Sequence, residues 1–331
     1  NAAQVGILRF LDRNYAFMER FLPVARAVPM RANTAESQNR AEIRRFAERV
    51  IERFVPTRTD VAVLLPCSAR KPYSLSQSHR LFMKTVNRRG HELIVTSPLG
   101  LVPRELEQIY PAGHYDVPVT GYWDREECAF IADILARYFA MHPYRRVIAH
   151  LEGGALTVAE MAAEAAGIDL EVTCRGYPTS PASLAALDAA LEGERRVQTD
   201  TIRGTVSWQF ATDIETKGLS LRGRSMQMTV LRGKQQIFSI DAGTGLFRPT
   251  FEGWQMIPEG YRVRIDAFVP QGDVLAPGVV DCDPQIREGD EVLVEGPLAL
   301  ATGRAMMGAD EMLRSERGVA VRVRKTKKLG K

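Results

Sequence analysis

The amino-acid sequence predicts an α/β fold, in which a mostly parallel sheet covered by helices is followed by two small modules rich in short strands. Three observations lead to this prediction. From about Asp60, short apolar runs alternate with amphipathic stretches of about 10–15 residues, which is typical of βαβ units. The apolar runs contain no polar alternation, as expected for strands that are buried on both faces of a sheet. After about Asp200, strand-like runs follow one another between glycine-containing turns.

The composition is that of an ordinary globular protein. The chain has 331 residues, 45% hydrophobic and 25% charged, which fits about two domains and excludes disordered and collagen-like classes. Its longest apolar runs fall far short of the ~20 residues that span a membrane, and no charged-then-apolar leader opens the chain. The four cysteines form no CxxC pair, which excludes a four-cysteine zinc ribbon. We therefore expect a cytoplasmic protein in a reducing environment.

Individual elements follow from the hydrophobic periodicity. Residues 1–53 are expected to be helical, with a second, arginine-rich helix at their end. The strands expected in the α/β part are Val61–Leu65, Glu92–Thr96, Arg146–Leu151 and Leu170–Thr173. The helices expected there are Ser76–Arg88, Pro103–Tyr110, Arg125–Met141, Leu156–Ala166 and Ser183–Leu191. The strands expected in the last two modules are Thr205–Phe210, Met226–Leu231, Gln236–Ile240, Arg262–Phe268, Glu291–Val294, Ala299–Met306 and Val319–Val323.

The most informative segment is the polar loop that follows the first strand of the α/β part. That strand ends at Pro66, and the loop leads into a helix that begins near Ser76. Ligands of open α/β sheets bind outside the carboxyl ends of the strands, so a site is expected here. The loop brings together a thiol, two cations, a phenol and an imidazole: Cys67, Arg70, Lys71, Tyr73 and His79.

Two interpretations of this loop are open. In the functional one, the two cations and the helix N-terminus lower the pKa of the Cys67 thiol, and Ser76 caps the helix. In the other, Cys67 packs as a small hydrophobic residue beside an exposed basic loop. The five histidines show no metal-ligand spacing, and the chain contains neither a Walker loop nor a GxGxxG motif. We therefore expect no metal and no cofactor.

Two further segments carry candidate binding residues. Pro98 and Gly100 follow the second strand, where the glycine permits a close backbone approach to a ligand. Downstream, Asp116 and Asp124 lie among aromatic residues that can stack on a base and hydrogen-bond to it. The alternatives are an ordinary connecting loop for the first segment and, for the second, a helix N-cap at Asp124. The candidate substrate-binding residues are thus Pro66, Arg70, Pro98, Gly100, Asp116 and Asp124.

Positive charge is concentrated at the end of the chain. The net charge is only +4, but residues 322–331 carry six cations and no acid, which suits a phosphate backbone. The alternative is a solvated tail. Residues 261–326 are expected to form a small half-open barrel that binds RNA mainly through its phosphates. The candidate RNA-binding residues are Arg304, Arg322, Arg324, Lys325, Lys327 and Lys328.

Two parts of the chain resemble known families. Residues 261–326 resemble a PUA domain, an RNA-binding module of RNA-modifying enzymes, in the stretches APGV, IREGDEV, GRA and RGVAVRVR. The pattern Pro66-Cys67-x3-Lys71-Pro72-Tyr73-x2-Ser76-x2-His79 resembles the signature of archaeosine synthase, the archaeal transglycosylase paralogue, and every position of that signature is filled.

The resemblance implies a reaction, a fold and partners. The family acts on tRNA that carries 7-cyano-7-deazaguanine in the D-loop and adds an amine from lysine, glutamine or ammonia to the nitrile. In some archaea a radical-SAM partner enzyme completes the product. Residues 54–195 are then expected to resemble uracil-DNA glycosylases, and residues 200–260 to resemble the small α+β domain that precedes the PUA domain of residues 261–331. Longer members carry a transglycosylase-like barrel with a zinc site, to which nothing here corresponds.

These expectations lead to a hypothesis about catalysis. Cys67 lies near the nitrile carbon as a nucleophile or a polarising donor, and Lys71 lowers its pKa or holds an anionic group. His79 or Tyr73 transfers the proton, and Ser76 is a hydrogen-bond partner or only a cap. The alternative function is a non-catalytic tRNA-binding subunit of a split archaeal tRNA-guanine transglycosylase. A base-excision glycosylase has fold analogy alone in its favour. A homodimer is also left open.

Overall fold

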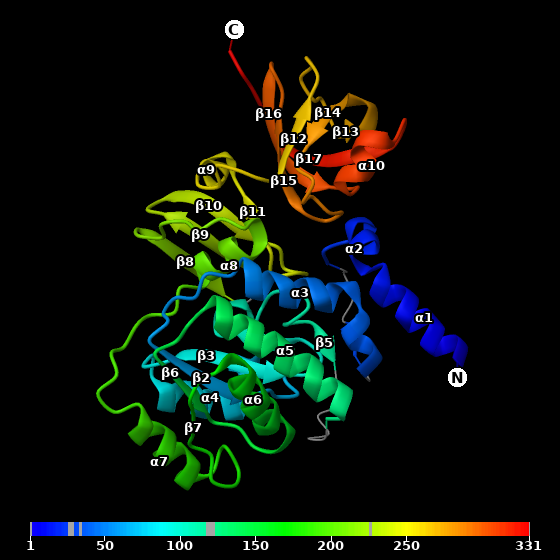
Figure 1. Cartoon of the computed structure of the whole chain (residues 1–331). Coiled ribbons are helices and arrows are strands. Elements are labelled where there is room, and N and C mark those ends of the chain that lie inside the picture. Colours follow the sequence, from blue (N-terminus) through cyan, green and yellow to red (C-terminus); the bar gives the residue numbers. More distant parts are fainter. Residues whose placement is uncertain (1, 26–29, 33–34, 117–122, 225–226, 331) are drawn as a thin grey trace. The chain divides into compact units, whose positions relative to one another are not determined.

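The computed structural model describes residues 2–25, 30–32, 35–116, 123–224 and 227–330. The chain forms two compact units. Residues Val28–Gln209 make up the central unit, and Asn1–Ala27 together with Phe210–Lys331 make up the terminal unit. The two units are described separately below, with the elements labelled in Figure 1.

The central unit is built on a five-stranded sheet with the order β4-β3-β2-β6-β7. Its strands are β2 (Val61–Pro66), β3 (His91–Thr96), β4 (Gly100–Pro103), β6 (Arg146–Ala149) and β7 (Leu170–Val172). Neighbouring strands are parallel except β4, which pairs antiparallel with β3 at the edge. The predicted α/β fold with a mostly parallel sheet is therefore confirmed, with an antiparallel edge strand that the prediction did not include.

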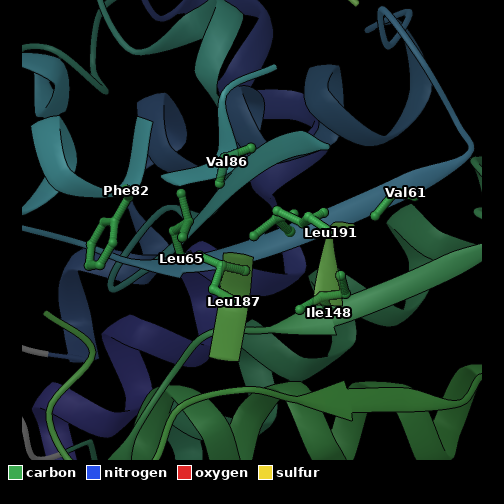
Figure 2. Close-up of a cluster of buried hydrophobic side chains, with 8 residues drawn as sticks. Val61, Leu65, Phe82, Val86, Ile148, Leu187 and Leu191 are labelled. Atoms are coloured by element: carbon green, nitrogen blue, oxygen red, sulfur yellow. The ribbon is translucent and has the colours of Figure 1, made fainter. Parts of the chain in front are cut away.

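Helices cover both faces of this sheet. They are α3 (Ala41–Glu52), α4 (Gln77–Val86), α5 (Arg125–Met141), α6 (Gly153–Ala166) and α7 (Pro181–Ala190). On one face, α4 and α7 contribute to an apolar cluster with the alternate residues of β2 (Figure 2). The cluster consists of Val61, Val63, Leu65, Phe82, Val86, Ile148, Leu187 and Leu191. The intervening residues Ala62 and Leu64 are also fully buried, which confirms that β2 is covered on both sides.

Two predicted elements are wrong. Residues Pro103–Tyr110 do not form a helix: Gly100–Pro103 is strand β4, and only a short 3₁₀ turn follows at Arg104–Leu106. Thr205–Phe210 is not a strand but part of helix α8 (Thr201–Phe210). Asp200 accepts a hydrogen bond from the Arg203 backbone amide across 2.9 Å and so caps this helix. Because nearly the whole surface of α8 is buried, its aromatic and β-branched residues imitate a strand.

The terminal unit combines both ends of the chain. Its N-terminal part holds α1 (Ala2–Arg13), α2 (Tyr15–Met18) and a 3₁₀ turn (Glu19–Phe21). This part is anchored to the C-terminal part, because the Val24 amide donates to the Glu288 carbonyl across 2.9 Å and Arg287 pairs with Glu19 at 2.8 Å. The helical segment expected at residues 1–53 is thus divided between the units, since α3 lies in the central unit.

The C-terminal part of the terminal unit contains two sheets. The first is antiparallel, with the order β11-β10-β9-β8, and the second is a six-stranded, nearly closed barrel with the order β13-β17-β16-β15-β12-β14. The strands of the first are β8 (Leu219–Arg224), β9 (Gln227–Arg232), β10 (Gln235–Ile240) and β11 (Phe247–Pro249), followed by α9 (Phe251–Gln255). The barrel consists of β12 (Arg262–Ile265), β13 (Val274–Leu275), β14 (Val279–Cys282), β15 (Glu291–Glu295), β16 (Ala299–Ala305) and β17 (Val319–Lys328), with α10 (Ala309–Arg314). The predicted strands here are confirmed to within a few residues, although Met226 lies outside the described residues.

Candidate active site

The candidate site lies at the carboxyl edge of the central sheet. Because β2, β3, β6 and β7 are parallel, the loops that begin at Cys67, Ser97, His150 and Thr173 all leave the sheet at this edge. Strand β2 is central and fully buried up to Leu65, so the loop after it starts from a rigid position. The structure therefore places the Pro66–Arg80 loop where a ligand of an open α/β sheet is expected.

Three hydroxyl groups meet beside Cys67, and we call Tyr73, Thr96 and Tyr115 the hydroxyl cluster. The Tyr115 hydroxyl lies 2.7 Å from the Tyr73 hydroxyl and 2.6 Å from Thr96 Oγ1. The Lys71 ammonium lies 4.0 Å from the centre of the Tyr115 ring, in cation–π contact. All three cluster side chains are buried, whereas Cys67 and Lys71 are half-buried. The Lys71 ammonium nitrogen itself is buried, so the charge lies inside the site with the hydroxyl cluster.

The pKa of Cys67 differs from the sequence-based expectation. Burial raises the pKa of the thiol, and this effect exceeds the opposing effects of a hydrogen bond with Thr96 and the charge of Lys71. The lowered pKa of the functional interpretation is therefore wrong. Burial of the thiol against the hydroxyl cluster and the exposed Arg70 agree with the other interpretation, in which Cys67 packs beside an exposed basic loop.

His79 is a buried residue behind this cluster rather than an exposed acid. It lies on α4, with no solvent-exposed surface, and its ring centre is 5.3 Å from that of Tyr73. Arg104 donates a hydrogen bond to His79 Nδ1 across 2.8 Å. Burial and, second, the Arg104 charge lower the pKa of His79 to about 3, while the Pro66 carbonyl opposes this shift. The ring is therefore neutral at physiological pH.

Arg104 connects several parts of the site. Its guanidinium also pairs with Glu92 at 2.6 Å and with Glu107 at 2.8 Å. Glu107 in turn accepts a hydrogen bond from the backbone amide of Ser74, within the candidate loop, across 2.9 Å. This buried network holds the loop to the turn that follows β4, so that Arg104 fixes both the histidine and the loop backbone.

Two other predicted site residues cap helices. The Ser76 hydroxyl accepts a hydrogen bond from the His79 amide across 3.2 Å and caps α4. Asp124 accepts one from the Glu127 amide across 2.8 Å and caps α5. Both contacts agree with the capping alternatives. The side chain of Asp116 lies outside the described part of the structure, although its backbone forms strand β5 (Tyr115–Asp116).

Pro98 and Gly100 are both buried. Gly100 has a φ of 78°, and a Cβ atom placed there would lie 2.7 Å from Ile134 Cδ1 on α5. Its missing side chain thus makes room for a helix, not for a ligand. Pro98 follows a cis peptide bond and is also buried.

The six basic residues of the barrel fall into two groups. Arg304 pairs with Asp241 at 2.7 Å, and Arg324 pairs with Glu291, and both of these carboxylates are buried. The remaining four residues on β17 are exposed: Arg322, Lys325, Lys327 and Lys328. This second group is the one available to an RNA backbone.

Sequence reasoning missed three residues that shape the site: Thr96, Tyr115 and Arg104. Thr96 ends a predicted strand, and that position was its only signal. Tyr115 is placed by the pairing of β5 with β1 (Met30–Arg31), where the Met30 amide donates to the His114 carbonyl across 2.9 Å. No local pattern indicates this long-range pairing. Arg104 was hidden by the incorrect helix at Pro103–Tyr110.

Within the described ranges, no group of three or more His, Cys, Asp or Glu side chains is arranged to hold a metal ion. Among the helices described, none combines the length and apolar character needed to cross a lipid bilayer.

Known proteins resemble this chain over nearly its whole length. A PUA domain model matches residues 263–326, and the model of a domain of unknown function (DUF5591) matches residues 43–191. The archaeosine synthase subunit alpha of Methanosarcina acetivorans is 41% identical over 98% of this chain. The archaeosine synthase of Haloferax volcanii is 41% identical over 96% of it. The chain is a homologue of the archaeosine synthases.

The similarity covers the chain but not the whole of these relatives. The chain spans 56% and 57% of the lengths of the two archaeosine synthases. A tRNA-guanine(15) transglycosylase of Methanobrevibacter smithii is 26% identical over 96% of the chain and 48% of its own length. The crystal structure of AF0587, a protein of unknown function, superposes with a TM-score of 0.71 at 29% identity. It covers 85% of this chain, and the match includes 99% of AF0587.

Proposed function

We propose that this archaeosine synthase homologue modifies tRNA by adding an amine to the nitrile of 7-cyano-7-deazaguanine in the D-loop. The observation that carries the proposal is the placement of Cys67, Lys71 and Tyr73 together at the carboxyl edge of the sheet. The 41% identity with archaeosine synthases over nearly the whole chain supports it. Because the chain spans little more than half of those relatives, its substrates and partners are part of the proposal.

The chemistry needs a nucleophile, a cation and a proton carrier near the nitrile. In the covalent version, the Cys67 thiolate adds to the nitrile carbon, and the nitrogen takes up one proton, which gives a thioimidate. The amine then displaces the thiolate and loses a proton, and the product is the amidine. Lys71 stabilises the negative charge that develops on the nitrile nitrogen. In the direct version, the amine attacks the carbon, and one proton passes from the amine to the nitrile nitrogen.

The structure supports different roles for the remaining motif residues. Tyr73 is the candidate for moving the proton, because its hydroxyl belongs to the cluster beside Cys67. His79 is held neutral by burial and Arg104, so we assign it a positioning role behind Tyr73. Ser76 acts as the helix cap. Arg70, exposed on the loop, is available for a tRNA phosphate or for the carboxylate of an amino-acid donor.

The terminal unit is proposed to bind the tRNA through its PUA domain, with Arg322, Lys325, Lys327 and Lys328 on phosphates. We further propose a uracil-DNA-glycosylase-like fold for residues 54–195 and a pre-PUA domain at residues 200–260. Lysine or glutamine is the proposed amine donor. A radical-SAM enzyme or a separate transglycosylase subunit is the proposed partner protein, in the cytoplasm.

The experiment is nucleoside mass spectrometry of tRNA that carries 7-cyano-7-deazaguanine. The tRNA is incubated with the chain and with lysine, glutamine or ammonium in parallel reactions. An amine adduct with one donor supports the proposal and identifies the nitrogen source. Unchanged nitrile with all three donors, despite tRNA binding, contradicts it and favours the alternative of a non-catalytic tRNA-binding subunit.

A further inference from the structure

We propose that Tyr115, which lies outside the signature motif, is a positioning residue whose ring holds the Lys71 ammonium beside Cys67. This inference rests on the proposed function for its meaning, since it concerns the same site. It concerns a residue outside the motif, in the aromatic segment next to Asp116.

Tyr115 is fixed from two directions. Its backbone is paired with Met30 through the parallel strands β5 and β1. Its hydroxyl lies within hydrogen-bonding distance of two groups, Tyr73 at 2.7 Å and Thr96 at 2.6 Å. With only 3% of the residue exposed, the ring has no freedom to turn away. The face of the ring is therefore a permanent surface of the site.

The ammonium of Lys71 lies 4.0 Å from the centre of that ring. A cation over a tyrosine face is stabilised by the ring quadrupole, more strongly where water is excluded. Lysine is otherwise a flexible side chain with a strongly hydrated charge, which favours an excursion into solvent. The ring keeps the charge at the position from which it acts on the Cys67 thiol.

The ring and the hydroxyl of Tyr115 have separable effects. The ring holds Lys71, whereas the hydroxyl links Tyr73 with Thr96, and Thr96 is also the hydrogen-bond partner of Cys67. Replacing Tyr115 by Phe removes only the hydroxyl and keeps the ring that contacts Lys71. Replacing it by Leu removes the ring as well. A residue that merely fills space would show no such difference at Cys67.

The test measures the rate of Cys67 alkylation by iodoacetamide from neutral to alkaline pH, resolved by peptide mass spectrometry. Because only the thiolate reacts, the pH midpoint reports the pKa of Cys67. The proteins are the wild type, Lys71→Met, Tyr115→Leu and Tyr115→Phe. A matched control is Tyr144→Phe, which removes a hydroxyl from another tyrosine pair, that of half-buried Tyr144 with buried Tyr138, 2.9 Å apart.

We expect Lys71→Met and Tyr115→Leu to raise the midpoint by a similar amount, about half a pH unit or more. Tyr115→Phe, which keeps the ring, and Tyr144→Phe are both expected to leave the midpoint unchanged. The proposal is overturned if Tyr115→Leu matches the wild type while Lys71→Met does not. It is also overturned if Lys71→Met has no effect, or if Tyr115→Phe raises the midpoint as far as Lys71→Met. The last comparison remains decisive if the Leu variant does not fold.

Alkylation requires neither tRNA nor turnover. A midpoint that shifts as expected in a chain without amine-adding activity would support the positioning role and contradict the proposed reaction. Full amine-adding activity of the wild type, combined with an unchanged midpoint in Tyr115→Leu, would support the proposed reaction and contradict the positioning role. Each of the two proposals can therefore be contradicted without contradicting the other.

Discussion

The guanidinium of Arg104 donates a hydrogen bond to Nδ1 of His79 across 2.8 Å, and this contact determines which ring nitrogen of the motif histidine carries the proton. A guanidinium donates hydrogen bonds and accepts none. Nδ1 must therefore be the acceptor, and the neutral ring carries its proton on Nε2. Arg104 is itself compensated by Glu92 and Glu107. Because the histidine is held as a neutral ring, we propose Tyr73 rather than His79 for the proton transfer.

The first prediction concerns the titration of His79. Burial, followed by the charge of Arg104, lowers the pKa of His79 to about 3, so its ring signals should not titrate between pH 8 and pH 5. The unfolded chain takes up this proton near the ordinary value of about 6.5. The contribution of neutral His79 to the free energy of unfolding is therefore fully present above about pH 6.5. It falls by ~1.4 kcal/mol per pH unit as the pH drops towards 3. Histidine-selective NMR, assigned with a His79→Gln variant, measures the titration. A ring that titrates near 6 would contradict the buried pairing.

Gly100→Ala is predicted to destabilise the central unit by about 2–4 kcal/mol, because the residue has a positive φ and Ile134 occupies the space of a Cβ atom. Calorimetric unfolding of the variant should show the loss as a lower transition temperature. Gly154→Ala is the matched control, since its Cβ would meet the Trp123 ring at an ordinary 3.5 Å. Equal transition temperatures for both variants would show that the Ile134 contact is unimportant.

Arg304 is predicted to stabilise the terminal unit and to contribute little to RNA binding. It pairs with Asp241 and approaches Glu291, carboxylates that are 5% and 1% exposed. Burial raises the pKa of Glu291, whereas for Asp241 the arginines outweigh the same effect and lower the pKa. Arg304→Gln should cost about 1–3 kcal/mol, less than a fully buried pair because Arg248 and Arg324 remain. Urea unfolding measures this cost, and a variant as stable as the wild type would refute the assignment.

The lysines of β17 are predicted to contribute to RNA binding and little to stability. Combined substitution of Lys325, Lys327 and Lys328 by Gln should leave unfolding unchanged, because their side chains are exposed. It should reduce the slope of log tRNA affinity against log salt by about one for each lysine on a phosphate. Binding of wild-type, triple-variant and Arg304→Gln proteins across a salt series tests this. An unchanged slope in the triple variant would exclude these residues from the interface.

How far the sequence predicts the molecule depends on whether the signal is local. The four parallel strands and helix α5 were predicted closely, because hydrophobic periodicity and the Asp124 cap are encoded within each segment. Helix α8 was taken for a strand, because burial on nearly all its surface removes the helical pattern. The edge strand β4 was missed because Gly100 makes a tight return that no periodicity indicates.

The same distinction applies to the candidate site. The motif residues were found because they are consecutive along one loop. Tyr115 was not, since its position depends on the pairing of β5 with a strand more than eighty residues earlier, at Met30. The interpretation that lowers the pKa of Cys67 is wrong because it counts the charge of sequence neighbours, whereas burial is a property of the folded chain.

The most direct test of the central claim, that Cys67 acts on the nitrile as a nucleophile or a polarising donor, is the initial rate of amine addition to nitrile-bearing tRNA in three proteins. These are the wild type, Cys67→Ala and Cys174→Ala, and the last replaces another half-buried free cysteine on the same sheet edge. We predict that Cys174→Ala retains the wild-type rate and that Cys67→Ala loses at least ~100-fold. A Cys67→Ala protein that converts the nitrile as fast as the wild type would contradict the account.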